Sequence, residues 1–527
     1  MRDWITPQSR TGRFFSFYLV LALPLLRLLV RARYELWRPE VAASLLLLTL
    51  PCLALATLPG GVPVFLGLLT LWVSFFAATG VQAQVSSGLP WGMYFAALAM
   101  LVGGAALAFR ERFALLMTIY LGGMVGAEAG LALAGDRGDS SGETAANAAP
   151  RSGPPPAHTI HLILDEQTGM AGFPQQIGAC ESAARTWRET LERHGFTVFP
   201  NAFSNYDMTW ISIPSILNER LLEGEGQFQR RNHIVPGNRL FAKATARGLD
   251  LAVYQSDFMR FSNDRHRYRR VREYDSNDVS AMLAVPAAWT ERVRHLLVWY
   301  FMLDRPLASL LKLRFPELAM GIRMGPLAVR KIWPRIILED IVAARRPTLF
   351  FAHLLTPHAP FIYDATGRVR PSAEWKGPLA LSDAEYVARY RDYCGQSAFL
   401  AHQLDVFFGD LRKAGILDTA HVVLHGDHGA RVRVVKNLEE ADDIWKKYPA
   451  QPTLRDLLDS FSVMFAVRSP GASHGTVNPA KGSILSLLWL SEGRPDPGAD
   501  SDFNKIYVAS EDGVIARSIS ILRLWRD

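Results

Sequence analysis

The chain has 527 residues, a length that suggests two or three domains. Hydrophobic residues make up 49% of it and the formal net charge is +7, which fits either contact with an anionic membrane or a surface richer in arginine than in acid. No basic stripe interleaved with aromatic residues occurs, so no nucleic-acid partner is expected. Three cysteines without a CxxC or Cys/His knuckle argue against a zinc finger. Cys52 lies in an apolar run, so Cys180 and Cys394 are the two that can pair outside a membrane.

The first 135 residues are predicted to form a transmembrane domain. Apolar segments close to the ~20 residues that cross a hydrocarbon core lie at 14–31, 41–58, 62–82, 91–109 and 113–134. Arg27 interrupts the first segment, which leaves an interfacial amphipathic helix as its alternative. Loop arginines favour a cytoplasmic N-terminus. The chain is therefore expected to be a multi-pass protein of the inner (cytoplasmic) membrane, with everything after residue 135 periplasmic or extracellular.

Residues 136–157 are rich in Gly, Ser, Ala and Pro and are predicted to be a flexible linker. Beyond it, β-rich runs alternate with helical patterns, which predicts an α/β domain over 158–527, with a mostly parallel sheet sandwiched by helices. Strands are expected at 158–166, 347–358 and 419–429, and a helix at 181–194. The apolar and basic stretch 284–345 has two interpretations: juxtamembrane helices lying on the bilayer, or ordinary core helices of the soluble domain.

Three predicted strand ends carry side chains of the types that bind metals. Asp165 and Glu166 follow the first strand, His358 follows the second, and Asp427 and His428 follow the third. In open α/β sheets, ligands bind beyond the carboxyl ends of the strands. Carboxylates and imidazoles suit zinc or manganese, so the sequence predicts a divalent metal ion as cofactor.

These segments resemble motifs of the sulfatase and alkaline phosphatase superfamily. The family's metal-binding strand end resembles VVLHGDHG (422–429), and its opening strand with a metal-binding acid resembles HLILDE (161–166). The nucleophile segment of lipid A phosphoethanolamine transferases and lipoteichoic acid synthases, in which a threonine starts a helix, is similar to NAFSNYDMTWISIPSILN (201–218). The family's histidine loop resembles HLLTPHAPF (353–361), and its late strand resembles FSVMFAVRSPG (461–471). The predicted membrane helices ahead of these motifs also match such membrane-anchored transferases.

The resemblance implies a ligand set and a nucleophile. Thr209 would be the nucleophile that forms a covalent phospho-threonine, because a divalent cation lowers the pKa of a hydroxyl. A plain helix N-cap is the alternative role for this threonine. The metal ligands would be Asp165, Thr209, Asp427 and His428. Glu166 is kept beside Asp165 as a candidate, because neighbouring side chains of a strand point to opposite faces.

Further histidines and an arginine complete the candidate site. His358 would contact the transferred group or protonate the leaving group. His474 and Arg431 are candidates for substrate binding, against the alternative of exposed loop positions. His353, His421 and His425 are interpreted as core or supporting residues.

The resemblance implies transfer of a phospho-head group, such as phosphoethanolamine or phosphoglycerol. The donor would be a membrane phospholipid, and the acceptor an envelope glycan or lipid. A phosphodiesterase, phosphatase or sulfatase-type hydrolase would use the same ligand set. Cys180 lies in CESAAR, which lacks the proline of a formylglycine motif, so a formylglycine sulfatase is not expected. A catalytically inactive envelope scaffold is the alternative from another class, and metal analysis would distinguish it.

Overall fold

The computed structural model describes most of the chain beyond residue 156 and part of the N-terminal region. The described residues are 10–31, 34–57, 100, 157–221, 238–262, 266–274, 289–290, 292–293, 296–297, 325–371, 374–375, 377–434, 453–494, 501–509 and 515–520. The chain divides into two compact units. One consists of Met1–Glu143 and Val279–Gly321, and the other of Thr144–Asp278 and Ile322–Asp527.

Among its described residues, the first unit contains the helices α1 (Arg10–Arg31), α2 (Pro39–Leu47) and α3 (Thr49–Thr57). The helix α1 covers the predicted segment 14–31. The predicted segment 41–58 is not one helix, because Pro51 has no N–H for the carbonyl of Leu47 and α2 ends there. Within the described part of the chain, no helix combines the length and the hydropathy needed to cross a bilayer.

Other N-terminal predictions fall largely outside the described residues. The predicted segments 62–82, 91–109 and 113–134 do so apart from Met100, and the predicted linker 136–157 does so apart from Ala157.

Within the first unit, the buried carboxylate of Glu40 is paired with Arg292 at 3.4 Å.

The stretch 284–345 is split between the two units. Its last part forms α13 (Gly325–Ala328), the 3₁₀ turn η7 (Val329–Lys331) and α14 (Arg335–Ala343). Trp333, Ile337 and Ile341 are buried in the hydrophobic core of the second unit. The core-helix interpretation therefore describes this last part, whereas residues 298–324 lie outside the described residues.

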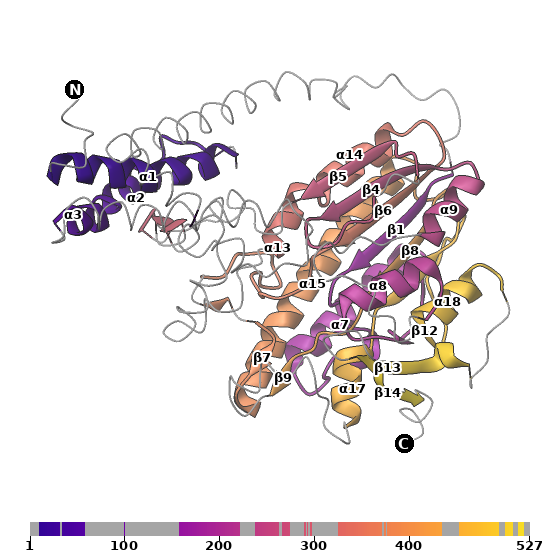
Figure 1. Ribbon diagram of the computed structural model, residues 1–527. Coiled ribbons are helices and arrows are strands. Elements are labelled where there is room, and N and C mark those ends of the chain that lie inside the picture. Colours follow the sequence, from indigo (N-terminus) through magenta and orange to yellow (C-terminus); the bar gives the residue numbers. More distant parts are fainter. Residues whose placement is uncertain are drawn as a thin grey trace. The chain divides into compact units, whose positions relative to one another are not determined.

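An eight-stranded sheet lies at the centre of the second unit, in the order β11-β2-β10-β8-β1-β6-β4-β5 (Figure 1). Its strands are β1 (Thr159–Leu164), β2 (Thr197–Val198), β4 (Asp250–Ser256), β5 (Arg270–Tyr274), β6 (Thr348–Leu354), β8 (His421–Gly426), β10 (Phe465–Arg468) and β11 (Thr476–Val477). Strand β1 is parallel to β6 and β8, and β4 is parallel to β5 and β6, whereas β10 is antiparallel to β8 and β2. The predicted α/β domain with a mostly parallel sheet is confirmed.

Helices cover both faces of this sheet, which explains why β1, β6 and β8 are nearly continuous apolar runs. One face packs against α7 (Gly178–Arg193), α14 and α15 (Asp383–Lys413), and the other against α8 (Thr209–Asn218), α9 (Arg239–Ala246) and α18 (Ile484–Ser491). Leu162 faces the first group, and Ile163, next along β1, faces the second. A disulfide between Cys180 and Cys394, the pair indicated by the sequence, joins α7 to α15.

Smaller elements surround the sheet. They are η5 (Met170–Gly172), β3 (Asn201–Phe203), β7 (Leu379–Ala380), β9 (Arg433–Val434), α17 (Leu454–Phe461), β12 (Lys481–Ser483), η9 (Asp502–Asn504), β13 (Lys505–Ala509) and β14 (Ile515–Ser520). The short strand β12 pairs with β3, which is followed in the chain by α8. The carboxyl ends of β1, β6 and β8 therefore meet at one edge of the sheet, beside the start of α8 (Figure 1).

Candidate active site

Two aspartates meet at this edge because their strands are neighbours. Asp165 follows β1 and Asp427 follows β8, and the last residues of these strands, Leu164 and Gly426, are paired in register. A Cβ atom at Gly426 would lie 2.3 Å from the carbonyl oxygen of Gln167, so the approach of the two segments requires glycine. Both aspartates are fully buried.

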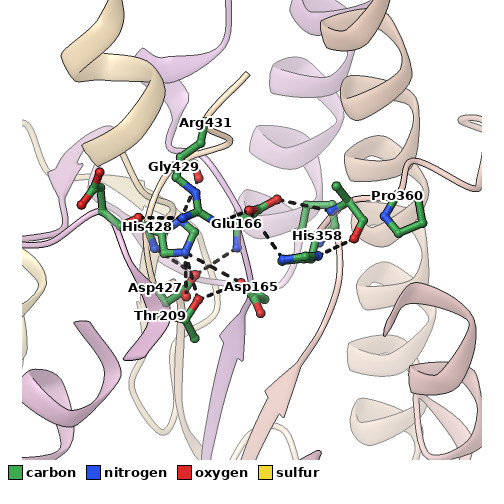
Figure 2. Close-up of polar contacts among 12 residues, drawn as sticks. Asp165, Glu166, Thr209, His358, Pro360, Asp427, His428, Gly429 and Arg431 are labelled. Carbon is green, nitrogen blue, oxygen red and sulfur yellow. Dashed lines mark hydrogen bonds and ion pairs between the residues drawn. The ribbon is translucent and has the colours of Figure 1, made fainter. Parts of the chain in front are cut away.

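His428 completes a group of three potential metal ligands with these aspartates (Figure 2). One ligand atom from each of Asp165, Asp427 and His428 lies within 4.8 Å of the other two. The Nδ1–H of His428 donates to the carbonyl of Gly429 at 2.9 Å. This hydrogen bond leaves Nε2 with a free lone pair, 3.2 Å from Oδ2 of Asp427 and 4.0 Å from Oδ1 of Asp165.

The electrostatics of this group fit a divalent cation. Among the described residues, Oδ2 of Asp165 and Oδ2 of Asp427 are buried without a hydrogen-bond partner. Burial and the charge of Asp165 raise the pKa of Asp427 well above its usual range. Burial alone would raise the pKa of Asp165. The nearby His358, His353 and His428 lower it by more than burial raises it, so the pKa of Asp165 lies below its usual value. Two adjacent buried carboxylates and a neutral imidazole are a donor set that zinc or manganese would stabilise.

Thr209 is the first residue of α8, and its side chain points at the three ligands (Figure 2). Its Oγ1 lies 3.0 Å from Nε2 of His428 and 3.4 Å from Oδ1 of Asp165. The N-cap position belongs to Met208, so the plain N-cap role is not the one observed. Ser212 donates to the carbonyl of Asp427 at 2.6 Å and so fixes the first turn of α8 against the end of β8. The positive end of the helix dipole faces the site.

Glu166, Arg431 and His358 form a second polar group beside the three ligands (Figure 2). The guanidinium of Arg431 is ion-paired with the carboxylate of Glu166, which also accepts the backbone N–H of Ala359 at 3.3 Å. Nε2 of His358 lies 3.7 Å from Oε1 of Glu166, and this histidine is 22% exposed. The sequence left open whether Asp165 or Glu166 binds metal. The structure groups Asp165 with Asp427, whereas the carboxylate of Glu166 is engaged by Arg431.

The backbone at two of these residues is strained. Glu166 has φ +63° and Arg431 has φ +53°, in the left-handed region that non-glycine residues rarely adopt. These conformations turn the two side chains toward each other. Arg431 also donates to the carbonyl of Asp207 at 3.1 Å, two residues before Thr209. Strain of this kind often marks functional sites. Here it occurs in both segments that follow β1 and β8.

His474 does not belong to this site, which corrects the sequence-based prediction. Strand β10 is antiparallel to β8, with Arg468 opposite Val422, so the chain leaves β10 at the amino end of β8. There Gly471 donates to the carbonyl of Asp418 at 2.8 Å. The exposed His474 therefore lies beyond the opposite end of β8 from Asp427, about 20 Å away along a six-residue strand.

One residue that supports the site was expected from the sequence to be a core or supporting residue, and two others were not anticipated. Nε2 of His353 lies 3.5 Å from Oδ2 of Asp165, and both side chains are fully buried, which makes this histidine a supporting residue. In β6 it is paired with Ile163 of β1. Tyr393 and Gln396 of α15 contact backbone groups of the site segments, and nothing in their sequence pattern indicates this.

The disulfide bears on one alternative. Cys180 is bonded to Cys394 within the core between α7 and α15. It therefore has no free thiol for conversion to formylglycine, in agreement with the sequence-based expectation.

Comparison with known proteins gives likeness in fold only. No protein-family model and no curated protein matches the sequence. Among solved structures, the chain is similar to the C-terminal periplasmic domain of EptC from Escherichia coli in complex with zinc (12% identity, 71% of this chain and 95% of that chain, TM-score 0.40). It is also similar to the lipoteichoic acid synthase LtaP from Listeria monocytogenes (14% identity, 67% and 78%, TM-score 0.36). A protein of the alkaline phosphatase superfamily from Vibrio parahaemolyticus is another such likeness (10% identity, 69% and 75%, TM-score 0.39).

Proposed function

We propose that the chain is a metal-dependent enzyme of the alkaline phosphatase superfamily that transfers a phospho-head group from a membrane phospholipid to an envelope glycan or lipid. Phosphoethanolamine and phosphoglycerol are the groups expected. The observation that carries the proposal is the convergence of Thr209, at the start of a helix, with Asp165, Asp427 and His428. A nucleophilic hydroxyl beside a cation site is the arrangement that phosphoryl transfer through a covalent intermediate requires.

Zinc or manganese would be held by Asp165, Asp427 and His428, with Thr209 in reach, and would supply charge stabilisation and a lowered hydroxyl pKa. The residues of the chain account for the remaining steps. Thr209 gives its proton to solvent, its Oγ1 bonds to phosphorus, and the ester bond to the lipid alcohol breaks. The departing oxygen takes a proton from His358, which is partly exposed beside Glu166.

The second half reverses the first. A hydroxyl of the acceptor gives its proton to His358 and bonds to phosphorus, and the Thr209–phosphorus bond breaks. Thr209 then regains a proton from solvent. The guanidinium of Arg431, close to both Asp207 and Glu166, is placed to contact the negative phosphoryl oxygens.

We further propose that the chain is integral to the inner membrane and that its catalytic unit faces the periplasm or the cell exterior. The apolar N-terminal segments support anchoring. The buried disulfide between Cys180 and Cys394 supports an oxidising compartment, because such bonds persist outside the cytoplasm.

Intact-mass and peptide mass spectrometry of the zinc-loaded full-length protein tests the reaction. After incubation with vesicles of phosphatidylethanolamine or phosphatidylglycerol, a head-group adduct is expected on the peptide that contains Thr209. Thr209→Ala should carry no adduct, and Thr190→Ala, a similarly buried threonine of α7, should carry the same adduct as the wild type. Turnover that releases free phospho-head group in water, with no acceptor needed, would instead indicate a hydrolase. A protein that binds no divalent metal and forms no adduct would be a scaffold.

A further inference from the structure

One helix hydrogen-bonds to two of the segments that carry the candidate site and reaches a third through Asp459 of α17. The helix α15 runs from Asp383 to Lys413 through the core of the second unit. Three of its buried residues, Tyr390, Tyr393 and Gln396, follow one another at intervals of three and so lie along one stripe of its surface. Their side-chain hydrogen bonds go to Asp459 and to backbone groups of the site segments.

Gln396 holds the segment that carries His358. Its Oε1 accepts the backbone N–H groups of Ile362 at 2.7 Å and Tyr363 at 3.1 Å. Its Nε2 donates to the carbonyls of Pro357 at 2.9 Å and His358 at 3.1 Å. Both ends of one fully buried amide are thus used on a single segment, on either side of the histidine side chain.

Tyr393 holds the segment that carries Glu166. Its hydroxyl donates to the carbonyl of Glu166 at 2.8 Å and accepts the backbone N–H of Thr168 at 2.9 Å. Because Glu166 is in a left-handed conformation, these two hydrogen bonds stabilise a backbone geometry that the residue would otherwise rarely adopt. Asp165 is its immediate neighbour in the chain.

Tyr390 acts on the segment that carries Arg431, through Asp459 of α17. The hydroxyl of Tyr390 donates to Oδ1 of the buried Asp459, which also accepts the backbone N–H of Val432 at 3.2 Å. The carbonyl of Asp459 accepts the backbone N–H of Arg431 at 3.1 Å. A Cβ at Gly429 would lie 2.2 Å from that same carbonyl, so the two segments are in close contact.

We infer that Tyr390, Tyr393 and Gln396, here called the α15 stripe, are positioning residues that fix Arg431, Glu166 and His358 relative to one another and to the metal ligands. The three positioned side chains already contact one another, through the Arg431–Glu166 ion pair and the 3.7 Å approach of His358 to Glu166. A rigid helix is a more precise support for such a group than separate loops would be. The inference rests on the proposed function for its kinetic consequences, but its structural consequences can be measured without turnover.

Each residue of the α15 stripe should give a different signature in the full-length protein. Gln396→Leu should lower kcat roughly a hundredfold by displacing His358. Tyr393→Phe should weaken zinc binding, measured by calorimetry on the metal-free protein, by about tenfold. Tyr390→Phe should raise KM for an anionic phosphodiester by about tenfold, with zinc affinity unchanged.

Two matched variants control for loss of buried polar contacts. Tyr254→Phe removes another buried tyrosine hydroxyl that donates to an aspartate, Asp340, at 2.9 Å, on the far side of β6 from β1. Gln403→Leu removes a half-buried amide two turns further along α15 and controls for the substitution itself. Both should leave kcat, KM and zinc affinity at wild-type values. If Gln396→Leu does not fold, Gln396→Glu keeps the acceptor for the two N–H groups and loses the two donations, and should lower kcat by about tenfold.

A readout independent of activity is the rate at which diethyl pyrocarbonate modifies His358, followed by peptide mass spectrometry. Gln396→Leu should change this rate severalfold, while the exposed His402 of the same helix reports an unchanged rate. If the His358 rate and the zinc affinity are unmoved in the stripe variants, and all variants share the same loss of stability, the positioning role is overturned whatever the reaction is. If wild-type protein turns over no phosphodiester but these two readouts shift as expected, the proposed function fails and the positioning role stands.

Discussion

The two ends of strand β8 each hold a buried charged cluster, and the clusters differ in how well their polar groups are satisfied. At the amino end, the fully buried Arg468 donates from all three nitrogens, to the carbonyls of His194, Leu417 and Ala472 and to Oδ1 of Asp418. At the carboxyl end, Asp165 and Asp427 each leave one buried oxygen without a hydrogen-bond partner among the described residues.

This difference indicates that the cluster at the amino end of β8 is structural, whereas the cluster at its carboxyl end is a candidate binding site. A buried charge whose hydrogen bonds are complete stabilises the fold, and removing it costs stability. A buried carboxylate pair with unused oxygens is unfavourable by itself, and a cation would relieve it. The comparison therefore predicts that mutations at the carboxyl end affect function, whereas mutations at the amino end affect stability.

Among the variants at the carboxyl end of β8, Thr209→Ala should have the largest effect on function. Loss of the proposed nucleophile should lower turnover by at least about a thousandfold, because the nearby hydroxyl of Ser212 donates to the carbonyl of Asp427. The free energy of unfolding should change by only about 1 kcal/mol. Thr209→Ser keeps a hydroxyl and should retain measurable turnover. Undiminished turnover in Thr209→Ala would remove this residue from the mechanism.

Asp427→Asn tests the unsatisfied oxygens directly. The zinc affinity should fall by at least about a hundredfold, because one charged ligand is lost. The metal-free protein should be no less stable than the wild type, since a like charge beside Asp165 is removed. Asp418→Asn, at the other end of β8, should bind zinc normally in the same calorimetric titration. Equal affinities in the two variants would contradict the assignment of the site.

Arg468→Met should show the reverse pattern. The methionine fills the space of the arginine stem but leaves buried carbonyls unpaired, so the free energy of unfolding should fall by about 4 kcal/mol. Denaturant titration measures this loss. Zinc affinity and turnover per folded molecule should stay at wild-type values. A drop in zinc affinity as large as that of Asp427→Asn would show that the two ends are not independent.

A buried histidine pair between the two ends should make the stability of the protein depend on pH. Nε2 of His161 lies 2.8 Å from Nε2 of His425, and burial lowers the pKa of His425 from 6.5 to about 4 and that of His161 well below 6.5. The unfolded chain binds protons near pH 6.5 and the folded pair does not. For His425 alone, the stabilisation is therefore complete above pH 6.5 and falls by about 3 kcal/mol as the pH drops to 4.

The variant His425→Gln isolates this contribution in the metal-free protein. Its free energy of unfolding should depend less on pH between 6.5 and 4 than that of the wild type. Parallel pH profiles for the two proteins would mean that the histidine pair is not what titrates.

The strands and the grouping of Asp165, Asp427 and His428 were predictable because apolar strands ending in acids and histidines are visible in the sequence. The edge of the sheet at which a loop emerges was not predictable from the sequence. His474 was a candidate for substrate binding, but β10 is antiparallel to β8 and places the following loop at the opposite edge of the sheet. The choice between Asp165 and Glu166 depended on the left-handed backbone at Glu166.

The support from α15 was also hidden in the sequence. Tyr390, Tyr393 and Gln396 act through hydrogen bonds to the backbone of segments distant in the chain, and such contacts leave no local pattern. In the first unit, the prediction of one segment at 41–58 took no account of Pro51, whose missing N–H separates α2 from α3.

Anomalous diffraction from crystals of the zinc-loaded protein locates the ion without reference to activity. One strong zinc peak is expected within about 2.0–2.2 Å of a carboxylate oxygen of Asp165, a carboxylate oxygen of Asp427 and Nε2 of His428. Zinc bound elsewhere, with these three side chains left unligated at saturating metal, would contradict the assignment of the metal site.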